Sequence, residues 1–323
     1  MTDVFQSNPT ELQAAKTVVR NFYSEFAKAG PDTVGQVLSH WMPEKALWRG
    51  VHPFNEQTGP EAVAQTFWKP MLAAFSSLQR REDVFFAGQN EIDGFQSTWV
   101  TSMGHLMGLF DAPFLNIPPT RKIIMLRYAE FHRVADGRIA ETALFVDLLH
   151  LMMQAGLNPL LADQTGAQLV QPGPLTHDGL LFEPQAAEES RKTLHRINTM
   201  IGAISHANES PTPLPPEEEL AQDWHDDMIW WGPTGIGATY TIPRYIEQHQ
   251  GVFRRRLTGR AFNGHLCRMA EGHYGGFFGW PNLTLSNIDN FMGIPSNDAR
   301  ADMRVIDIYR RSGEKLAENW IFI

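Results

Sequence analysis

The first forty residues repeat apolar and polar positions with the period of an α-helix. Asn8, Pro9 and Glu11 form a favourable helix start, because an Asn side chain caps backbone N–H groups and Pro fits the first turn. Apolar positions then recur at helical spacing up to Gly30, namely Leu12, Ala15, Val18, Val19, Phe22, Tyr23 and Phe26. The pattern predicts a long amphipathic helix, and a short helix is expected after it over residues 32–40.

Further along the chain, helical spacing gives way to strands. A strand is predicted over 45–51, and then a helix over 58–75 that Pro70 should kink. Four strands follow, with Asp-Gly turns between some of them, at 81–87, 95–110, 123–134 and 138–146, and a final helix covers 148–155. Helices followed by antiparallel strands indicate an α+β fold, in which the helices pack on one face of a bent sheet.

The same plan then recurs. Helices are predicted over 188–206, 215–222 and 242–257, with strands over 227–232, 261–270, 274–285, 301–311 and 315–323. Phe114–Glu141 aligns with Phe291–Glu318 without a gap, and Trp48 and Gly50 align with Trp230 and Gly232. A match of this length indicates a duplicated domain, the alternative being chance similarity between amphipathic segments.

Three segments are therefore expected. A first domain spans 1–157, and a linker with several Gly and Pro residues spans 158–187. A second domain spans 188–323 and lacks the helix that ends the first. We expect the two domains to pack as a pseudo-dimer within one chain, and association of whole chains stays open.

Composition narrows the class of function. A net charge of -9 argues against nucleic acid and anionic membranes as partners, and no apolar run approaches a membrane span. The single cysteine, Cys267, rules out an internal disulfide, and the N-terminus lacks the pattern of a signal peptide, so a cytoplasmic location is expected. The chain carries no phosphate-binding loop and no metal-ligand spacing, so we expect neither a cofactor nor a metal.

Several local strings resemble the SnoaL-like polyketide cyclases, which belong to the nuclear transport factor 2-like superfamily. They are Phe22-Tyr23, LWRGVHPFNEQTG (47–59), GHLMGLFDAPFLNIPPTRK (104–122) and FHRVADGRIAETALFVDLLHLMMQAGL (131–157). The resemblance implies two tandem cone-shaped domains, each a curved antiparallel sheet with helices on its concave face. It also implies that Asp147, at the end of a strand, is the general acid/base of the first cone.

Asp147 and His105 are the predicted catalytic residues. A carboxylate among apolar side chains has a raised pKa and can transfer protons near neutral pH. The alternative role of Asp147 is to cap the helix that begins at Leu148. His105 shares a predicted strand face with Trp99 and Met103, where it would donate to an enolate oxygen or be a hydrogen-bonded core residue.

The predicted ligand-binding residues are mostly large aromatic side chains, for each of which core packing is the competing interpretation. In the first domain they are Trp48, His52, Trp68, Trp99, Met103 and Phe145; His52 alternatively lies in a surface loop. In the second they are Trp230, His249, Asp307 and Trp320, and Trp320 is expected to reshape the second cone. The position that would match Asp147 in the second domain is 324, one past the last residue of this sequence. The first domain is therefore the better candidate for catalysis.

These observations predict a cofactor-independent acid/base enzyme acting on a small, mostly apolar carbonyl compound. The reaction class would be cyclisation, isomerisation or dehydration. The alternative is a non-catalytic protein that binds a small molecule or acts as a scaffold and keeps a vestigial pocket.

Overall fold

The computed structural model describes residues 8–160, 170–297 and 299–323. Contacts divide the described residues into two compact units. The first unit comprises 8–159 together with 170–184, and the second comprises residue 160 together with 185–297 and 299–323. The expected division at 157 and 188 stays a prediction, and residues 161–169 of the expected linker lie outside the described ranges.

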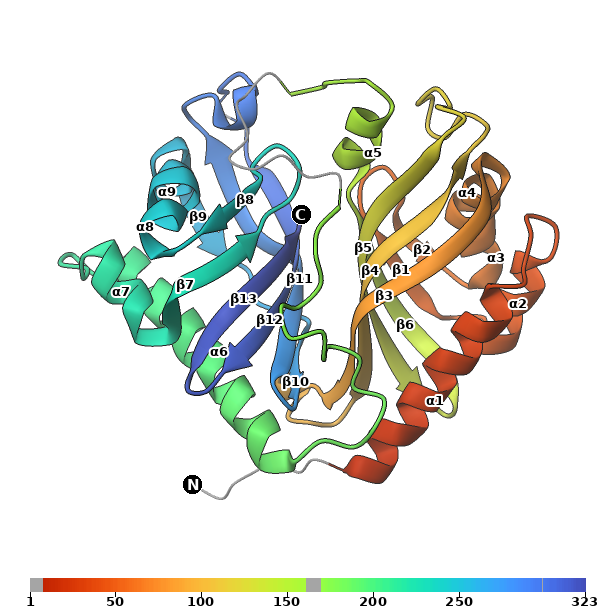
Figure 1. The fold of residues 1–323 in the computed structure, drawn as a ribbon, viewed down its shortest axis with the longest axis horizontal. Coiled ribbons are helices and arrows are strands. Elements are labelled where there is room, and N and C mark those ends of the chain that lie inside the picture. The colour runs from red at the N-terminus through yellow and green to blue at the C-terminus, as the bar shows by residue number, and fades with distance from the viewer. Residues whose placement is uncertain (1–7, 161–169, 298) are drawn as a thin grey trace. The chain divides into compact units, whose positions relative to one another are not determined.

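The helices of the first unit are α1 (Pro9–Phe26), α2 (Val34–Trp41), α3 (Pro60–Val63), the π-helical turn η1 (Ala64–Trp68), α4 (Lys69–Ala74) and, after the last strand, α5 (Leu148–Gln154). In Figure 1, α1, α2, α3 and α4 lie together on one side of the sheet, whereas α5 lies apart from them. The Asn8 side chain caps α1 by accepting the N–H of Glu11 at 3.3 Å. The helix expected over 58–75 is thus interrupted by a π turn just before Pro70.

The first sheet has six strands in the order β2-β1-β6-β5-β4-β3. Their bounds are β1 (Leu47–Gly50), β2 (Asn55–Thr58), β3 (Phe75–Gln89), β4 (Thr98–Phe110), β5 (Ile123–Ala135) and β6 (Arg138–Val146). All neighbours are antiparallel except β1 and β6, which pair in parallel. Sequence analysis did not predict β2, and it started β3 six residues too late.

Residue alternation assigns each strand position to one side of this sheet. Ser102 of β4 pairs with Glu130 of β5, which pairs with Leu144 of β6, so these three share a side. The hydroxyl of Tyr23 on α1 donates to Glu130, which identifies this as the helix-facing side. The opposite side carries the intervening positions.

Part of the expected linker packs on the first unit. The Phe85 N–H donates to the Gly179 carbonyl, and the Leu181 N–H donates to the Phe85 carbonyl, both at 2.8 Å. The buried Lys16 ammonium of α1 donates to the carbonyl oxygens of Leu181 at 2.6 Å and of Glu183 at 3.3 Å. Residues 179–181 therefore pair with the outer edge of β3 at Phe85, whose backbone groups would otherwise be unpaired there.

The second unit repeats the arrangement. Its sheet runs β10-β11-β12-β13-β7-β8, with β9 also paired to β11, and only β13 and β7 are parallel. The strands are β7 (Trp224–Trp231), β8 (Ala238–Tyr240), β9 (Leu257–Phe262), β10 (Cys267–Glu271), β11 (Tyr274–Asn287), β12 (Ala301–Ser312) and β13 (Lys315–Phe322). Read from the other edge, the main path has the strand order of the first sheet. The strand predicted over 261–270 is in fact two, β9 and β10.

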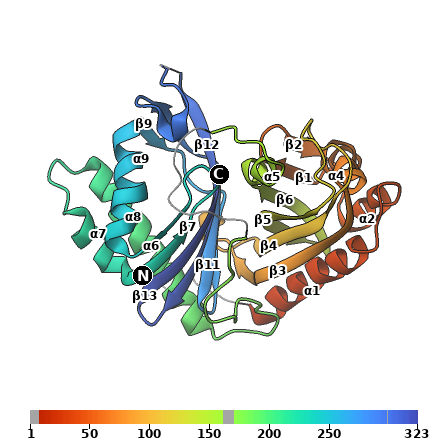
Figure 2. The same cartoon turned by 45° about the horizontal axis from the view of Figure 1, so that its top comes forward.

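The helices of the second unit are α6 (Ala187–Glu209), α7 (Pro216–Asp223), α8 (Ile242–Tyr245), η3 (Ile246–Gln250) and α9 (Gly251–Arg256). Figure 2 shows α8 and α9 on one side of the sheet. Ile197 and Met200 of α6 pack with Phe277 and Tyr309 in one buried cluster, which identifies the helix-facing side of this sheet.

Two tryptophans hold matching positions in the two sheets. Trp48 pairs with Thr142 across the parallel β1–β6 contact, and Trp230 pairs with Asn319 across β7–β13. Each ring covers a glycine two residues later, because a Cβ added at Gly50 or Gly232 would meet the ring within 2.2 Å. Both Trp side chains are 2% exposed, so they anchor the cores rather than line an open surface.

Within the described ranges, every helix is too short or too polar to cross a lipid bilayer.

Candidate functional site

A network of polar side chains is buried between α1 and the first sheet. The Glu130 Oε2 atom accepts a hydrogen bond from the Tyr23 hydroxyl at 3.0 Å and lies 3.2 Å from His132 Nε2. The Tyr23 hydroxyl is also 3.0 Å from His132 Nε2. His132 Nδ1 lies 2.9 Å from the Thr142 hydroxyl, which fixes the plane of the imidazole ring. The sheet alternation explains the cluster, since Glu130 and His132 are two residues apart on β5.

Arg80 of β3 adds a cation to this network. Its Nη1 atom donates to Glu130 Oε2 at 2.9 Å. Its Cζ atom lies 3.9 Å from the centre of the Tyr23 ring and 4.6 Å from that of Tyr128. The second terminal nitrogen, Nη2, is buried and has no acceptor among the described residues. The guanidinium is therefore held on two aromatic faces with one donor still available.

The charges of the network determine its protonation. Burial acts to raise the pKa of Glu130, but the neighbouring His132 and Arg80 outweigh burial and bring this pKa to about 2. Burial, followed by the Glu130 charge, raises the pKa of Tyr23 well above its ordinary value. At neutral pH, Glu130 is thus an ionised acceptor and Tyr23 a neutral phenol.

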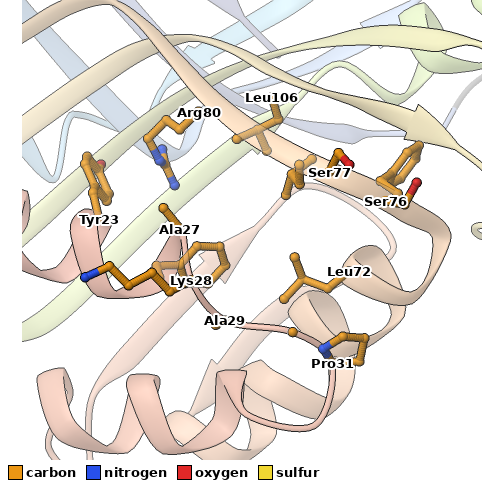
Figure 3. Close-up of a pocket in the computed structure, with 14 residues that line it drawn as sticks. Tyr23, Ala27, Lys28, Ala29, Pro31, Leu72, Ser76, Ser77, Arg80 and Leu106 are labelled. Carbon is orange, nitrogen blue, oxygen red and sulfur yellow. The ribbon is translucent and has the colours of Figure 1, made fainter.

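A cavity of about 290 Å³ opens beside Arg80 and Tyr23. Its walls come from the end of α1 and the turn after it (residues 26–31), from Leu72 of α4, from the start of β3 and from Leu106 of β4. Figure 3 shows Tyr23 and Arg80 on one side of it, and Ser76 and Pro31 on the other. The cavity combines apolar walls with a few polar groups, as small-molecule sites do. We call it the Arg80 cavity.

Glu82 lies next to Arg80 on the same side of β3. It pairs with Gly104, and its Oε1 atom accepts from the Ser102 hydroxyl at 3.1 Å. Ser102 in turn is 2.7 Å from the Tyr128 hydroxyl. Burial, only partly offset by Arg80, raises the pKa of Glu82. The pKa of Glu82 is therefore higher than that of Glu130.

The structure gives Asp147 a capping role. Asp147 Oδ1 accepts the N–H of His150 at 3.0 Å at the start of α5, and Oδ2 lies 3.4 Å from Arg127 Nη1. Burial lowers the pKa of Arg127 to about 10, in spite of the Asp147 charge. Asp147 is buried but is not among the residues that line the Arg80 cavity. Its catalytic role stays a prediction.

The residues expected to line the first cone lie on the side of the sheet that points away from α1. His105 pairs with Arg127, and Met103 and Phe145 both pair with Ala129. These positions, together with Trp99, alternate with Ser102 and Glu130 and point away from α1. His105 Nδ1 lies 3.5 Å from Asp83 Oδ2, and His105 Nε2 accepts the N–H of Gln171 at 3.3 Å. The expectation that Trp99, Met103, His105 and Phe145 line the first cone is therefore wrong.

The remaining residues predicted in the first domain are divided between core and surface. Trp48 and Trp68 pack around Phe67, with ring centres 5.5 and 4.7 Å from it, and both are 2% exposed. They are core residues on the helix-facing side. His52 is exposed in the turn after β1.

The second unit brings together three of its four predicted residues. Trp230 and Asp307 lie on the helix-facing side of the sheet, since Trp230 pairs with Asn319 and Asn319 with Tyr309. His249 stacks on Trp230, with ring centres 3.9 Å apart. Trp320 pairs with Ile308 and Trp231, which places it on the opposite side. The expectation that Trp320 reshapes the second cone is thus wrong.

Sequence analysis missed Arg80, Glu82, Glu130 and His132 as site residues. Glu130 and His132 did carry a signal, because charged residues two apart in an otherwise apolar strand are rarely buried without a reason. Arg80 directly precedes the strand predicted over 81–87 and Glu82 is the second residue of that strand, in a polar stretch where nothing distinguished them from solvated residues.

No group of three or more His, Cys, Asp or Glu side chains in the described part of the chain is arranged to hold a metal ion.

Comparison with known proteins gives one matching family model and several similar solved structures. The family model for SnoaL-like polyketide cyclase matches residues 17–155. None of the curated proteins matches the chain.

Three solved structures are similar to part of the chain. A protein from Jannaschia sp. CCS1, named as a proposed SnoaL-like polyketide cyclase, is 23% identical (TM-score 0.36, 48% of this chain and 99% of that one). IdmH from Streptomyces antibioticus, named as a proposed polyketide cyclase, is 16% identical (TM-score 0.35, 43% and 98%). A nuclear transport factor 2-like protein from Burkholderia thailandensis E264 is 17% identical (TM-score 0.33, 44% and 96%).

Proposed function

We propose that the first unit, in which residues 17–155 match the family model for SnoaL-like polyketide cyclase, is a cofactor-independent acid/base enzyme. Its substrate is a small, mostly apolar carbonyl compound that enters the Arg80 cavity. The reaction is a cyclisation, isomerisation or dehydration that passes through an enolate. The observation that carries the proposal is the buried Nη2 atom of Arg80, which has no acceptor among the described residues and belongs to a side chain that lines the cavity.

Arg80 stabilises the oxygen on which negative charge develops. Its guanidinium is fixed in advance by Glu130 and by the ring faces of Tyr23 and Tyr128, so little reorganisation is required when the enolate forms. A donor that is already desolvated also interacts more strongly than one in water. Arg80 therefore contributes more to the transition state than to the neutral substrate.

Glu82 is the proposed proton acceptor; it is not itself among the lining residues of the Arg80 cavity, and it is linked to the cavity through its neighbour Arg80. It is the nearest carboxyl group along β3 to Arg80 on the helix-facing side, and burial raises its pKa toward the range in which a general base is effective. Tyr23 lines the cavity as a neutral phenol whose hydroxyl donates to Glu130, and its ring face holds the Arg80 guanidinium. The catalytic role predicted for Asp147 stays open to the test described below, and that of His105 stays a prediction.

A binding protein without catalysis is the competing function, and one observation favours it. Glu130 is the most completely buried carboxylate of the network, yet its pKa of about 2 prevents it from accepting a proton near neutral pH. If Glu82 does not transfer a proton either, the same Arg80 cavity would hold a ligand without changing it. The expected partner, a small hydrophobic molecule, is the same in both cases.

The experiment is a metabolite screen by thermal shift on the full chain, repeated on Arg80→Met and Glu82→Gln. Arg80→Met should abolish the shift caused by ligands of this cavity, while Arg80→Lys should retain part of it. The matched control is Arg121→Met, because the Arg121 side chain is 77% exposed. Unchanged ligand binding in Arg80→Met would show that the ligand binds elsewhere.

The Glu82→Gln variant distinguishes catalysis from binding without catalysis. The enzyme predicts that Glu82→Gln still binds the ligand but converts it roughly 10²–10⁴-fold more slowly, the usual contribution of a general base. The binder predicts no conversion by the wild-type chain. Conversion at the wild-type rate in Glu82→Gln would remove Glu82 from the mechanism.

A further inference from the structure

The charged side chains among the described lining residues of the Arg80 cavity are both positive. They are Arg80 and Lys28, and these lining residues include neither Asp nor Glu. In Figure 3, Lys28, Tyr23 and Arg80 lie on one side of the cavity, away from Pro31 and Ser76. In a chain whose net charge is -9, this cavity therefore presents a positive end to a ligand.

The two cations differ in how their charges are compensated. Arg80 Nη1 donates to the Glu130 carboxylate at 2.9 Å, so the charge of Arg80 already has a partner. The Lys28 ammonium forms no ion pair within the ranges that the structure describes. Glu25, one turn earlier on α1, instead accepts the indole N–H of Trp41 at 2.9 Å. The charge that remains for a ligand to neutralise is thus that of Lys28.

Burial separates the positions suited to a ketone and to a carboxylate. Arg80 Nη2 is buried and has no acceptor among the described residues, whereas Lys28 is exposed just after the end of α1. A neutral carbonyl oxygen suits the buried donor, because Glu130 and Glu82 beside Arg80 would repel a second permanent anion. An ionised group is better placed at Lys28, where water continues to solvate it.

The remaining walls of the cavity are mostly apolar. Phe26, Leu72, Phe75 and Leu106 line it, and they come from α1, α4, β3 and β4. A volume of about 290 Å³ is at the lower end of the range for small-molecule sites. These walls suit a compact apolar body, such as a single aromatic ring with a short chain.

We propose that the Arg80 cavity selects an apolar oxo acid, whose ketone oxygen accepts from Arg80 Nη2 and whose carboxylate pairs with Lys28. This inference rests on the function proposed above and adds a permanent negative charge to its substrate class. Lys28 is then a specificity residue, which discriminates the acid from neutral ketones and takes no part in proton transfer.

Isothermal titration calorimetry of the full chain with matched compounds tests the proposal. The probe is 4-oxo-4-phenylbutanoate; its methyl ester lacks the charge, and 4-phenylbutanoate lacks the ketone. The oxo acid should bind about 5-fold more tightly than the ester, as expected for an ion pair at an exposed lysine. This preference should shrink at about 1 M salt, where the Debye length is about 3 Å. The acid without the ketone should bind more weakly than the oxo acid, because it leaves Arg80 Nη2 without an acceptor.

Variants locate the preference for the acid. Lys28→Met should weaken binding of the oxo acid about 5-fold, to the affinity of the ester, and should leave the ester unchanged. Lys28→Arg should retain most of the preference, because the positive charge is kept. Lys45→Met, at an exposed lysine of the same unit, is the matched control and should bind both compounds as the wild type does. Arg80→Met should weaken binding of both, since both present the ketone.

The outcomes separate this inference from the proposed function. Equal affinity for acid and ester, with both weakened in Arg80→Met, would overturn the oxo acid and leave the proposed function intact. A preference that survives in Lys28→Met would also overturn it. So would the absence of binding by the probe and by its isomer 2-oxo-4-phenylbutanoate, in which the ketone is adjacent to the carboxylate. Binding of acid and ester that Arg80→Met does not change would overturn both proposals, because the compounds would then bind outside the Arg80 cavity.

Discussion

Glu130 and Asp307 occupy the same register position in two sheets and have opposite electrostatic surroundings. Glu130 pairs with Leu144 on the next strand, and Asp307 pairs with Ile321, which matches Leu144 when the ungapped alignment is continued past Glu141 and Glu318. Arg80 and His132 lie within 3.2 Å of Glu130, whereas Asp307 contacts Asn319 and Tyr309. The same backbone position thus holds a permanently ionised carboxylate in one unit and a titrating one in the other.

Asp307 should make the stability of the second unit depend on pH. Its folded pKa of about 7 lies above the ordinary value of 3.8, so folding favours the protonated form. The stabilisation is fully present below pH 3.8 and is lost as the pH rises toward 7. In that window the unfolding free energy should fall by at most about 1.4 kcal/mol per pH unit.

Urea unfolding of wild type and Asp307→Asn across this pH range checks the prediction. The difference between the two proteins should change with pH in the stated direction, because Asn does not titrate. Parallel pH profiles for the two proteins would show that Asp307 titrates at the same pH in the folded and unfolded chains.

Trp48→Ala should destabilise the first unit by about 3–5 kcal/mol, since it removes a large buried ring and leaves a cavity over Gly50. Denaturant unfolding monitored by circular dichroism measures this cost. Trp41→Ala is the control, because Trp41 is only partly buried, and it should cost less. A loss below about 1 kcal/mol in Trp48→Ala would mean that the core closes over the missing ring.

Two substitutions at Asp147 separate capping from catalysis. Asp147→Asn keeps an oxygen for the His150 N–H but removes the charge beside Arg127, so it should cost about 1–3 kcal/mol. Asp147→Ala should cost roughly 1 kcal/mol more, because the cap is lost as well. Thermal and chemical unfolding give both values. Once a substrate is known, full turnover by Asp147→Asn would exclude Asp147 as the general base.

Lys16→Met should loosen the segment that covers the edge of β3. The substitution leaves the carbonyl oxygens of Leu181 and Glu183 without their ammonium donor, at a cost of about 1–3 kcal/mol. Hydrogen exchange of the Leu181 amide, which donates to Phe85, should become faster. The control is Lys122→Met, at an exposed lysine of the same unit. Unchanged protection of Leu181 would show that Lys16 does not hold the segment.

Sequence analysis predicted the α+β class, most of the helices and the correspondence of Trp48 with Trp230. It assigned the wrong side of β4 to the cone, and the physical reason is that both sides of this strand are buried. Ser102 and Thr101 are 0% exposed, and Met103 and His105 are 3% exposed. When both faces are covered, hydrophobic alternation no longer reports which face the helices occupy.

Arg80 and Glu82 could not be predicted as site residues for a related reason. β3 begins at Phe75, but its first residues are polar and irregular: Ser77 has a φ of 53°, and the pairing with β4 shifts between Ser76 and Gln79. Such bulges reposition side chains without leaving a recognisable pattern in the sequence. The contact of Asp307 with Asn319 was hidden too, because Asn319 lies on the next strand.

The edge contact of β3 with residues 179–181 has a consequence for dissecting this protein. A fragment that ends with α5 would contain all six strands of the first sheet, yet it would leave the N–H and carbonyl of Phe85 exposed at the edge of the sheet. An open edge of this kind recruits other strands, and oligomers formed by such a fragment would reflect the cut rather than the protein. Fragments of the first unit should therefore extend to Pro184.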